Sequence, residues 1–334
     1  MDLIAVRNNN NNLDSNNSEE RTPLRTYKRR VRRVMPDELV WEILLRLPPK
    51  TLARFKSVCR AWLAIISSPS FICMHLRQSA SRNECEPSFL IAAHTFCDMR
   101  SMPKTWNPEV PFYHWQEAGK GNASLVSTMD LPGDSGFAHC PLHCDGLVLL
   151  PTETKLYVFN PGTGDVLNLP DGQKNCGYAQ APGLGLDLGT NTYKVAQFFY
   201  RSVYYYKRTY NAGMEVFTIG GHGSCWRTVE DPPYPVIMPQ EPAYFKGSLS
   251  WHIERELLQT PLQGFLRFDL EEEKFDFISH PVLPSDEQPL QFIELGGKLC
   301  LVQYLPEEIV FWMSPSGDNH QWHRVYVIDN LPER

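Results

Sequence analysis

The sequence predicts an α+β multidomain protein, in which a small N-terminal helical module precedes a mostly β, propeller-like domain. Three observations support this prediction. Apolar residues between positions 35 and 80 recur at the spacing of one face of an α-helix. After about residue 80 the chain changes to short apolar runs separated by Gly, Pro, Asn and Asp. A pattern of glycines and aromatic residues then recurs at intervals of roughly 40–50 residues, which is typical of four-stranded propeller blades.

Residues 1–34 are predicted to form a separate polar tail. They include five consecutive asparagines and carry eight Lys/Arg against four Asp/Glu. Residues 1–20 have too few apolar side chains to offset the entropy of ordering, so we expect them to be disordered. Five basic residues follow: Lys28, Arg29, Arg30, Arg32 and Arg33. This cluster predicts either a nuclear localisation signal or a solvated flank of the first helix.

Charge and composition narrow the classes of function. Residues 35–334 carry a net charge of −10, which disfavours direct nucleic-acid binding. No apolar run approaches the roughly 20 residues needed to span a bilayer, so no membrane partner is expected. The nine cysteines lack paired spacing and the N-terminus lacks a secretory signal pattern. We therefore expect reduced thiols and a location in the nucleus, the cytoplasm or both.

Residues 35–80 are predicted to hold three helices. Four apolar residues share one face of the first: Leu39, Ile43, Leu44 and Leu47. Pro48 ends this helix, because proline cannot donate a backbone hydrogen bond. Thr51 is expected to cap a second helix that runs without a break to Ile66. Ser70 is expected to open a short last helix.

Residues 81–330 are predicted to be mostly β-strand. The clearest candidates are residues 88–93, 146–151, 156–161, 193–200, 214–219, 247–253, 264–270 and 298–304. Glycine precedes three of these strands, and four phenylalanines mark the repeat: Phe159, Phe217, Phe268 and Phe311. Their irregular spacing also leaves a β-sandwich open.

Four motifs in the helical segment occur together in one order. They are Pro36-x-Glu38-Leu39, Ile43-Leu44-x-Arg46-Leu47-Pro48, Leu52-x-Arg54-Phe55-Lys56-x-Val58-Cys59-Arg60-x-Trp62 and Ile66-x-Ser68-Pro69-x-Phe71. The segment resembles a plant-type F-box over about 42 residues. The departures from the pattern are small: Met35 replaces a leucine, and Pro49-Lys50-Thr51 replaces valine-lysine-serine.

The resemblance implies that these helices pack on a Skp-type adaptor, which bridges to a cullin scaffold. About 40 residues cannot bury a large core alone, so a leftover apolar face needs a partner. We place nine residues on or directly beneath that interface: Pro36, Leu39, Ile43, Leu44, Leu47, Pro48, Leu52, Val58 and Trp62. The alternative is that they fill a core shared with the β domain.

The second region resembles the F-box-associated domain of a large plant family. The matching pieces are Cys144-Asp145-Gly146-Leu147-Val148, Phe159-Asn160-Pro161-x-Thr163-Gly164, Tyr193-Lys194-Val195, Glu215-Val216-Phe217 through Trp226, and Lys246-Gly247-Ser248-Leu249-Ser250-Trp251. This resemblance implies a propeller-like receptor, residues 81–330, that holds a protein target.

Residues 201–210 are the candidate substrate surface. Tyr204, Tyr205, Tyr206 and Arg208 have the aromatic and cationic character of protein-recognition hot spots. The segment looks like an insertion before a strand beginning at Met214. The alternative is a long hairpin whose tyrosines alternate between core and solvent.

No cofactor, metal or catalytic residue is predicted. His139-Cys140-Pro141-Leu142-His143-Cys144 has zinc-ligand residue types, but no second cluster completes a tetrahedral site, and Cys144 enters an apolar strand. Motifs for a nucleophile elbow, a phosphate loop or a zinc protease are absent from the sequence.

We therefore expect a non-catalytic substrate-recognition subunit of an SCF-type (Skp-cullin-F-box) ubiquitin ligase. One alternative is a non-degradative F-box scaffold or transcriptional co-regulator in the nucleus. A propeller enzyme or small-molecule receptor is a third hypothesis.

Overall fold

The computed structural model describes residues 35–85, 88–92, 109–116, 122–131, 141–152, 154–176, 181–221, 225–238, 240–260, 262–279, 290–314 and 322–329. The chain forms two compact units, residues 1–43 and 44–334. The predicted basic cluster at Lys28–Arg33 lies outside the described residues.

Four helices form the N-terminal part of the described chain: α1 (Asp37–Leu45), α2 (Pro49–Phe55), α3 (Arg60–Ile66) and α4 (Pro69–Cys85). Asp37 and Glu38 occupy the first turn of α1. Their negative charges interact favourably with the positive end of the helix dipole. The predicted start and end of the first helix are confirmed to within two residues.

The predicted continuous second helix is wrong, because it breaks into α2 and α3. Cys59 is the N-cap of α3 and has an extended backbone, with φ −160° and ψ 163°. Its sulfur accepts a hydrogen bond from the backbone amide of Trp62. Thr51 does not cap α2; Pro48 holds that position, with Pro49 in the first turn. The predicted short last helix is instead α4, which is 17 residues long.

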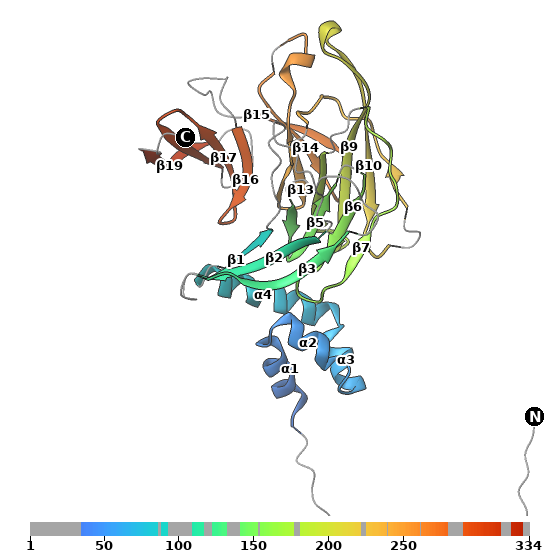
Figure 1. Cartoon of the computed structure of the whole chain (residues 1–334), viewed down its shortest axis with the longest axis vertical. Coiled ribbons are helices and arrows are strands. Elements are labelled where there is room, and N and C mark those ends of the chain that lie inside the picture. The colour runs from blue at the N-terminus through green and yellow to red at the C-terminus, as the bar shows by residue number, and fades with distance from the viewer. Residues whose placement is uncertain are drawn as a thin grey trace, which may run out of the picture. The chain divides into compact units, whose positions relative to one another are not determined.

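The rest of the described chain forms five antiparallel sheets, which are the blades of a five-bladed β-propeller (Figure 1). Blade 1 holds β1 (Ser88–Ala92), β2 (Glu109–Gln116) and β3 (Ser124–Asp130). Blade 2 holds β4 (Leu142–Cys144), β5 (Leu147–Pro151), β6 (Leu156–Phe159) and β7 (Val166–Asn168). Blade 3 holds β8 (Ala181–Asp187), β9 (Thr192–Tyr204), β10 (Thr209–Thr218) and β11 (Arg227–Thr228).

Blade 4 holds β12 (Ala243–Phe245), β13 (Ser248–His252), β14 (Gly264–Asp269) and β15 (Phe275–Ser279). Blade 5 holds β16 (Leu290–Leu295), β17 (Lys298–Tyr304), β18 (Glu308–Ser314) and β19 (His323–Asp329). Two short 3-10 turns, η2 (Tyr205–Lys207) and η3 (Arg255–Leu257), complete the elements among the described residues. All eight strands predicted from the sequence are present, and the β-sandwich alternative is wrong.

The repeat seen in the sequence corresponds to the blades. Phe159, Phe217, Phe268 and Phe311 each lie on the third strand of blades 2, 3, 4 and 5 respectively. Three of the glycines begin second strands: Gly146, Gly247 and Gly297. Asp145-Gly146 and Lys246-Gly247 both have positive φ at their two residues, which is the two-residue hairpin turn that suits twisted strands.

Most apolar side chains are buried between neighbouring blades. Side chains alternate along β5, so Val148 and Leu150 pack in the core shared with blade 1 while Leu149 packs in the core shared with blade 3. Separate cores join blade 3 to blade 4 and blade 4 to blade 5. Burial on both faces explains why these strands read as continuous apolar runs.

Candidate functional site

The predicted adaptor-binding residues divide into exposed and buried groups. Five are exposed at the surface of the helical module: Pro36, Leu39, Ile43, Pro48 and Val58. Leu39, Ile43 and Val58 leave 54%, 49% and 58% of their surface open to water. Leu44 and Leu52 are buried, and Leu47 and Trp62 are half-buried. The buried members therefore stabilise the helices from beneath, and the exposed Leu39 and Ile43 form an accessible apolar face on α1.

Sequence reasoning missed further exposed apolar residues on the same module. Leu63, Ile72 and Met74 on α3 and α4 are each between 45% and 47% exposed. Their apolar character was visible in the sequence, but helix phase alone could not show that they face solvent. Each of these side chains is a further exposed apolar residue of α3 or α4.

Polar contacts fix the helices of the module to one another. The His75 ring is buried on α4, and its Nε2 lies 2.9 Å from the carbonyl oxygen of Leu47. The Phe55 and Trp62 rings pack with centroids 5.1 Å apart, which joins α2 to α3. Residues 47–75 of the module are therefore held together by contacts of their own.

The predicted substrate surface is the turn of a long hairpin formed by β9 and β10 (Figure 1). It is not an insertion, since β10 begins at Thr209 and not at Met214. The tyrosines do not alternate between core and solvent: Tyr204, Tyr205 and Tyr206 are all exposed, and Tyr206 fully so. The Lys207 ammonium lies 5.7 Å from the centre of the Tyr204 ring, a cation–π distance.

The base of this hairpin is held by buried and bidentate contacts. The Tyr200 hydroxyl donates to the carbonyl of Val236 and accepts from its amide, at 2.8 and 2.9 Å. Both terminal nitrogens of Arg201 donate to the Asp231 carboxylate, at 3.0 and 2.9 Å. The Tyr210 hydroxyl donates to the carbonyl of Pro233 at 3.1 Å. The turn therefore projects from an ordered base.

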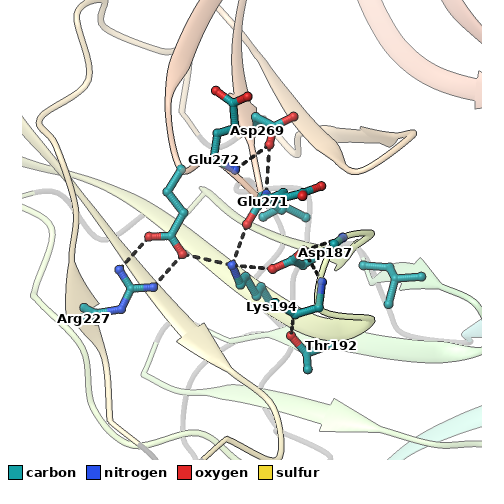
Figure 2. Close-up of polar contacts among 12 residues, drawn as sticks. Asp187, Thr192, Lys194, Arg227, Asp269, Glu271 and Glu272 are labelled. Carbon is teal, nitrogen blue, oxygen red and sulfur yellow. Dashed lines mark hydrogen bonds and ion pairs between the residues drawn. The ribbon is translucent and has the colours of Figure 1, made fainter. Parts of the chain in front are cut away.

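A buried ion network lies between blades 3 and 4 (Figure 2). The Lys194 ammonium lies 2.7 Å from Asp187 and 3.0 Å from Glu273, and it donates to the carbonyl of Leu270. Arg227 binds both carboxylate oxygens of Glu273, each at 2.6 Å. Glu273 has a left-handed φ of 55°, which places its carboxylate between the two cations.

The network explains the ionisation of its members. The hydrogen bond from Arg227, with help from Lys194 and against the effect of burial, lowers the pKa of Glu273. Burial opposes ionisation of Asp187, but the hydrogen bonds from Lys194 and Thr190 outweigh it and lower the pKa of that carboxyl. Sequence reasoning missed this network; its one visible signal was a lysine inside the apolar run of β9.

The candidate zinc residues are only partly described. His139 and Cys140 lie outside the described residues. Cys144 is buried in β4, where burial and the neighbouring Asp145 raise the pKa of its thiol to about 12. A thiol held protonated in this way packs as a small apolar side chain. Among the described residues, no group of three His, Cys, Asp or Glu side chains is arranged to hold a metal ion.

Comparison with family models assigns both parts of the chain. Residues 105–333 match the F-box associated beta propeller domain, and residues 34–74 match the F-box domain. The chain belongs to the F-box-associated β-propeller family. The F-box match covers α1 to α3 and the start of α4, which is the segment that carries the exposed apolar face.

The chain is similar to F-box proteins of a plant along most of its length. F-box protein At5g10340 of Arabidopsis thaliana is 27% identical over 330 residues, which cover 92% of this chain and 72% of the relative. The F-box/LRR-repeat/kelch-repeat protein At1g09650 of Arabidopsis thaliana is 29% identical over 315 residues, covering 88% of this chain and 77% of the relative. These relatives agree with the plant-type pattern seen in the sequence.

Solved structures resemble the chain only distantly. YjhT gives a TM-score of 0.41 with 10% identity, over 66% of this chain and 81% of that one. A chain of the nidogen/laminin complex gives a TM-score of 0.38 with 10% identity, over 65% of this chain and 76% of that one. Because both scores are below 0.5, the propeller assignment rests on the five sheets and the family match. No described helix of this F-box protein has the length and apolar character needed to cross a membrane.

Proposed function

We propose that this F-box protein is the substrate-recognition subunit of an SCF-type ubiquitin ligase. Its helical module docks on a Skp-type adaptor, and the adaptor connects it to a cullin scaffold. Its β-propeller holds a protein target, with Tyr204, Tyr205, Tyr206 and Arg208 among the contacts. The F-box and F-box-associated matches support this assignment.

The observation that carries the proposal is the exposed apolar face of the F-box. Leu39 and Ile43 are one helical turn apart on α1, and each leaves about half of its surface in water. Fully burying such a side chain contributes about 1.5–3 kcal/mol. Two of them at the centre of an interface supply enough free energy to act as binding hot spots.

The chain contributes proximity to the reaction. In the proposed complex a conjugating enzyme performs the transfer, and the chain raises the effective concentration of a target lysine near it. The protein itself therefore acts as a non-catalytic subunit. The propeller blades supply a rigid frame, since their cores are shared between neighbours.

Affinity purification with the native chain and two variants as tagged baits tests the proposal. One bait is the native chain, and another carries Leu39→Asp and Ile43→Asp. A third bait, Leu295→Asp, is the matched control, because Leu295 is an exposed leucine on β16. We expect adaptor and cullin to be recovered with the native and control baits only. Target proteins are expected to accumulate on the double variant.

Two outcomes favour other functions. Recovery of the adaptor without ubiquitination of any bound protein in a reconstituted reaction favours the non-degradative scaffold. Failure of the folded native bait to recover adaptor or cullin removes the ligase assignment altogether.

A further inference from the structure

The distal part of the β9–β10 hairpin has two open strand edges. β8 pairs with β9 only as far as Phe198, and β11 pairs with β10 only at Glu215 and Val216. Residues 202–204 and 209–211 therefore pair only with each other among the described strands. Open edges of this kind present backbone donors and acceptors to which an extended peptide can add as a further strand.

The turn that closes these edges carries unpaired positive charge. Lys207 and Arg208 have no carboxylate partner among the described residues, unlike Arg201 at the base of the hairpin, which pairs with Asp231. Negative charge also acts on the turn, since burial and then the charges of Glu254 and Glu256, at the start of η3, raise the pKa of Tyr205. An acidic ligand is thus attracted on the Lys207 side of the turn and repelled on the η3 side.

The aromatic side chains of the turn add apolar contact area at small entropic cost. Tyr204, Tyr205 and Tyr206 are exposed beside the two cations. Tyrosine has few rotatable bonds and offers both an apolar ring and a hydroxyl, and for this reason it is frequent at recognition surfaces. The surface therefore combines strand edges, rings and positive charge.

We propose that the distal β9–β10 hairpin binds an extended, acidic segment of a partner protein, which adds as a strand beside residues 202–204 or 209–211 and places carboxylates against Lys207 and Arg208. This inference deepens the proposed function and rests on it, because it assigns a chemistry to the target that the propeller holds. The ordered base of the hairpin reduces the entropy lost on binding.

A peptide titration on the full chain, without adaptor, tests the proposal. The probe is a fluorescein-labelled decapeptide of alternating valine and glutamate, followed by fluorescence anisotropy at neutral pH. Two matched probes replace glutamate with lysine, or the central valines with proline. We expect the acidic probe to bind, its Kd to rise with salt, and both matched probes to bind at least fivefold more weakly.

Variants of the turn locate the binding. Arg208 has φ 47° and ψ 48°, a conformation that glycine adopts freely, so Arg208→Gly removes the cation and keeps the turn. Lys207→Gln removes the second charge at similar length. Each substitution is expected to raise the Kd of the acidic probe at least fivefold. Lys298→Gln, an exposed lysine on β17, is the control and is expected to leave the Kd unchanged.

Three results would overturn the proposal: no binding of the acidic probe, equal binding of the lysine probe, or native affinity in Arg208→Gly. Equal binding of the proline probe would overturn strand addition. Adaptor binding is measured on the same preparations. A chain that binds the peptide and not the adaptor contradicts the ligase assignment alone, and a chain with the opposite behaviour contradicts the hairpin assignment alone.

Discussion

At the scale of single residues, two turn glycines have the same backbone conformation in different surroundings. Gly146 has φ +85° and Gly247 has φ +82°. A Cβ added at position 146 meets no atom within 4 Å, whereas at position 247 it meets the Leu188 side chain at 3.1 Å. The left-handed conformation alone costs an L-residue about 1–2 kcal/mol.

We therefore expect Gly146→Ala to lower the free energy of unfolding by about 1 kcal/mol and Gly247→Ala to lower it further. Urea denaturation of the two variants, with the native chain in parallel, measures the difference. Equal losses would show that Leu188 moves away at little cost, which contradicts the packing described for this turn.

The ion network predicts how the stability of the chain depends on pH. The pKa of Glu273 is lowered in the folded chain from its ordinary value of 4.5, so the contribution of this carboxylate is present above pH 4.5 and is lost as the pH falls through the lowered pKa. Glu273→Gln is therefore expected to lower the free energy of unfolding by on the order of 1 kcal/mol at pH 7. The effect is small because the Arg227 side chain is half-exposed, so water screens its interaction with Glu273. That difference should shrink below pH 4.5 in urea denaturation at several pH values. A constant difference from pH 7 to pH 3.5 would contradict the ionised network.

Residue chemistry explains why this network could not be predicted. Asp187, Lys194, Arg227 and Glu273 are spread over 87 positions, and all except Lys194, which lies in an apolar run, look like ordinary surface residues in their own segments. They meet because blades 3 and 4 pack face to face. The apolar face of α1 was predictable, since Leu39 and Ile43 lie one turn apart in a segment of helical periodicity, but its exposure to solvent was not.

At the scale of elements, strands with continuous apolar runs were predicted and a glycine-rich strand was missed. β8 has the sequence APGLGLD, whose Gly and Pro content is typical of a loop. A Cβ at Gly185 would meet the Tyr244 ring at 2.5 Å, so glycine there allows close approach of blade 4. The break between α2 and α3 was also missed, because cysteine is not a usual N-cap residue.

The packing of blade 5 gives an element-scale prediction. Phe265 of blade 4 and Phe292 of blade 5 stack with ring centroids 3.9 Å apart and planes within 9°. They belong to the core that joins blade 5 to blade 4, and no core among the described residues joins blade 5 to blade 1. Phe292→Ala is therefore expected to cost about 3 kcal/mol and to act mainly on blade 5.

Hydrogen exchange checks this expectation. Amides of β16 to β19 should lose protection in Phe292→Ala, while amides of β8 to β10 keep theirs. Val302→Ala, a buried change inside blade 5 away from that stack, is the comparison. Uniform loss of protection in all blades would contradict the view that this stack acts mainly on blade 5.

At the scale of the whole molecule, the chain separates two tasks. The F-box carries an apolar face, and the propeller carries a rigid frame with a charged and aromatic hairpin. Domain order and fold class followed from the sequence, because hydrophobic periodicity and turn residues report on local structure directly. The blade number did not, since blade 1 has only three described strands and its signal is weak.

The central claim is that the exposed face of α1 binds a Skp-type adaptor. The most direct test is a calorimetric titration of purified adaptor into three chains. They are the native chain, the double variant that carries both Leu39→Asp and Ile43→Asp, and the control Leu295→Asp. We predict tight binding to the native and control chains, and at least a 100-fold higher Kd for the double variant, which corresponds to about 3 kcal/mol. Native affinity in a folded double variant would contradict the claim.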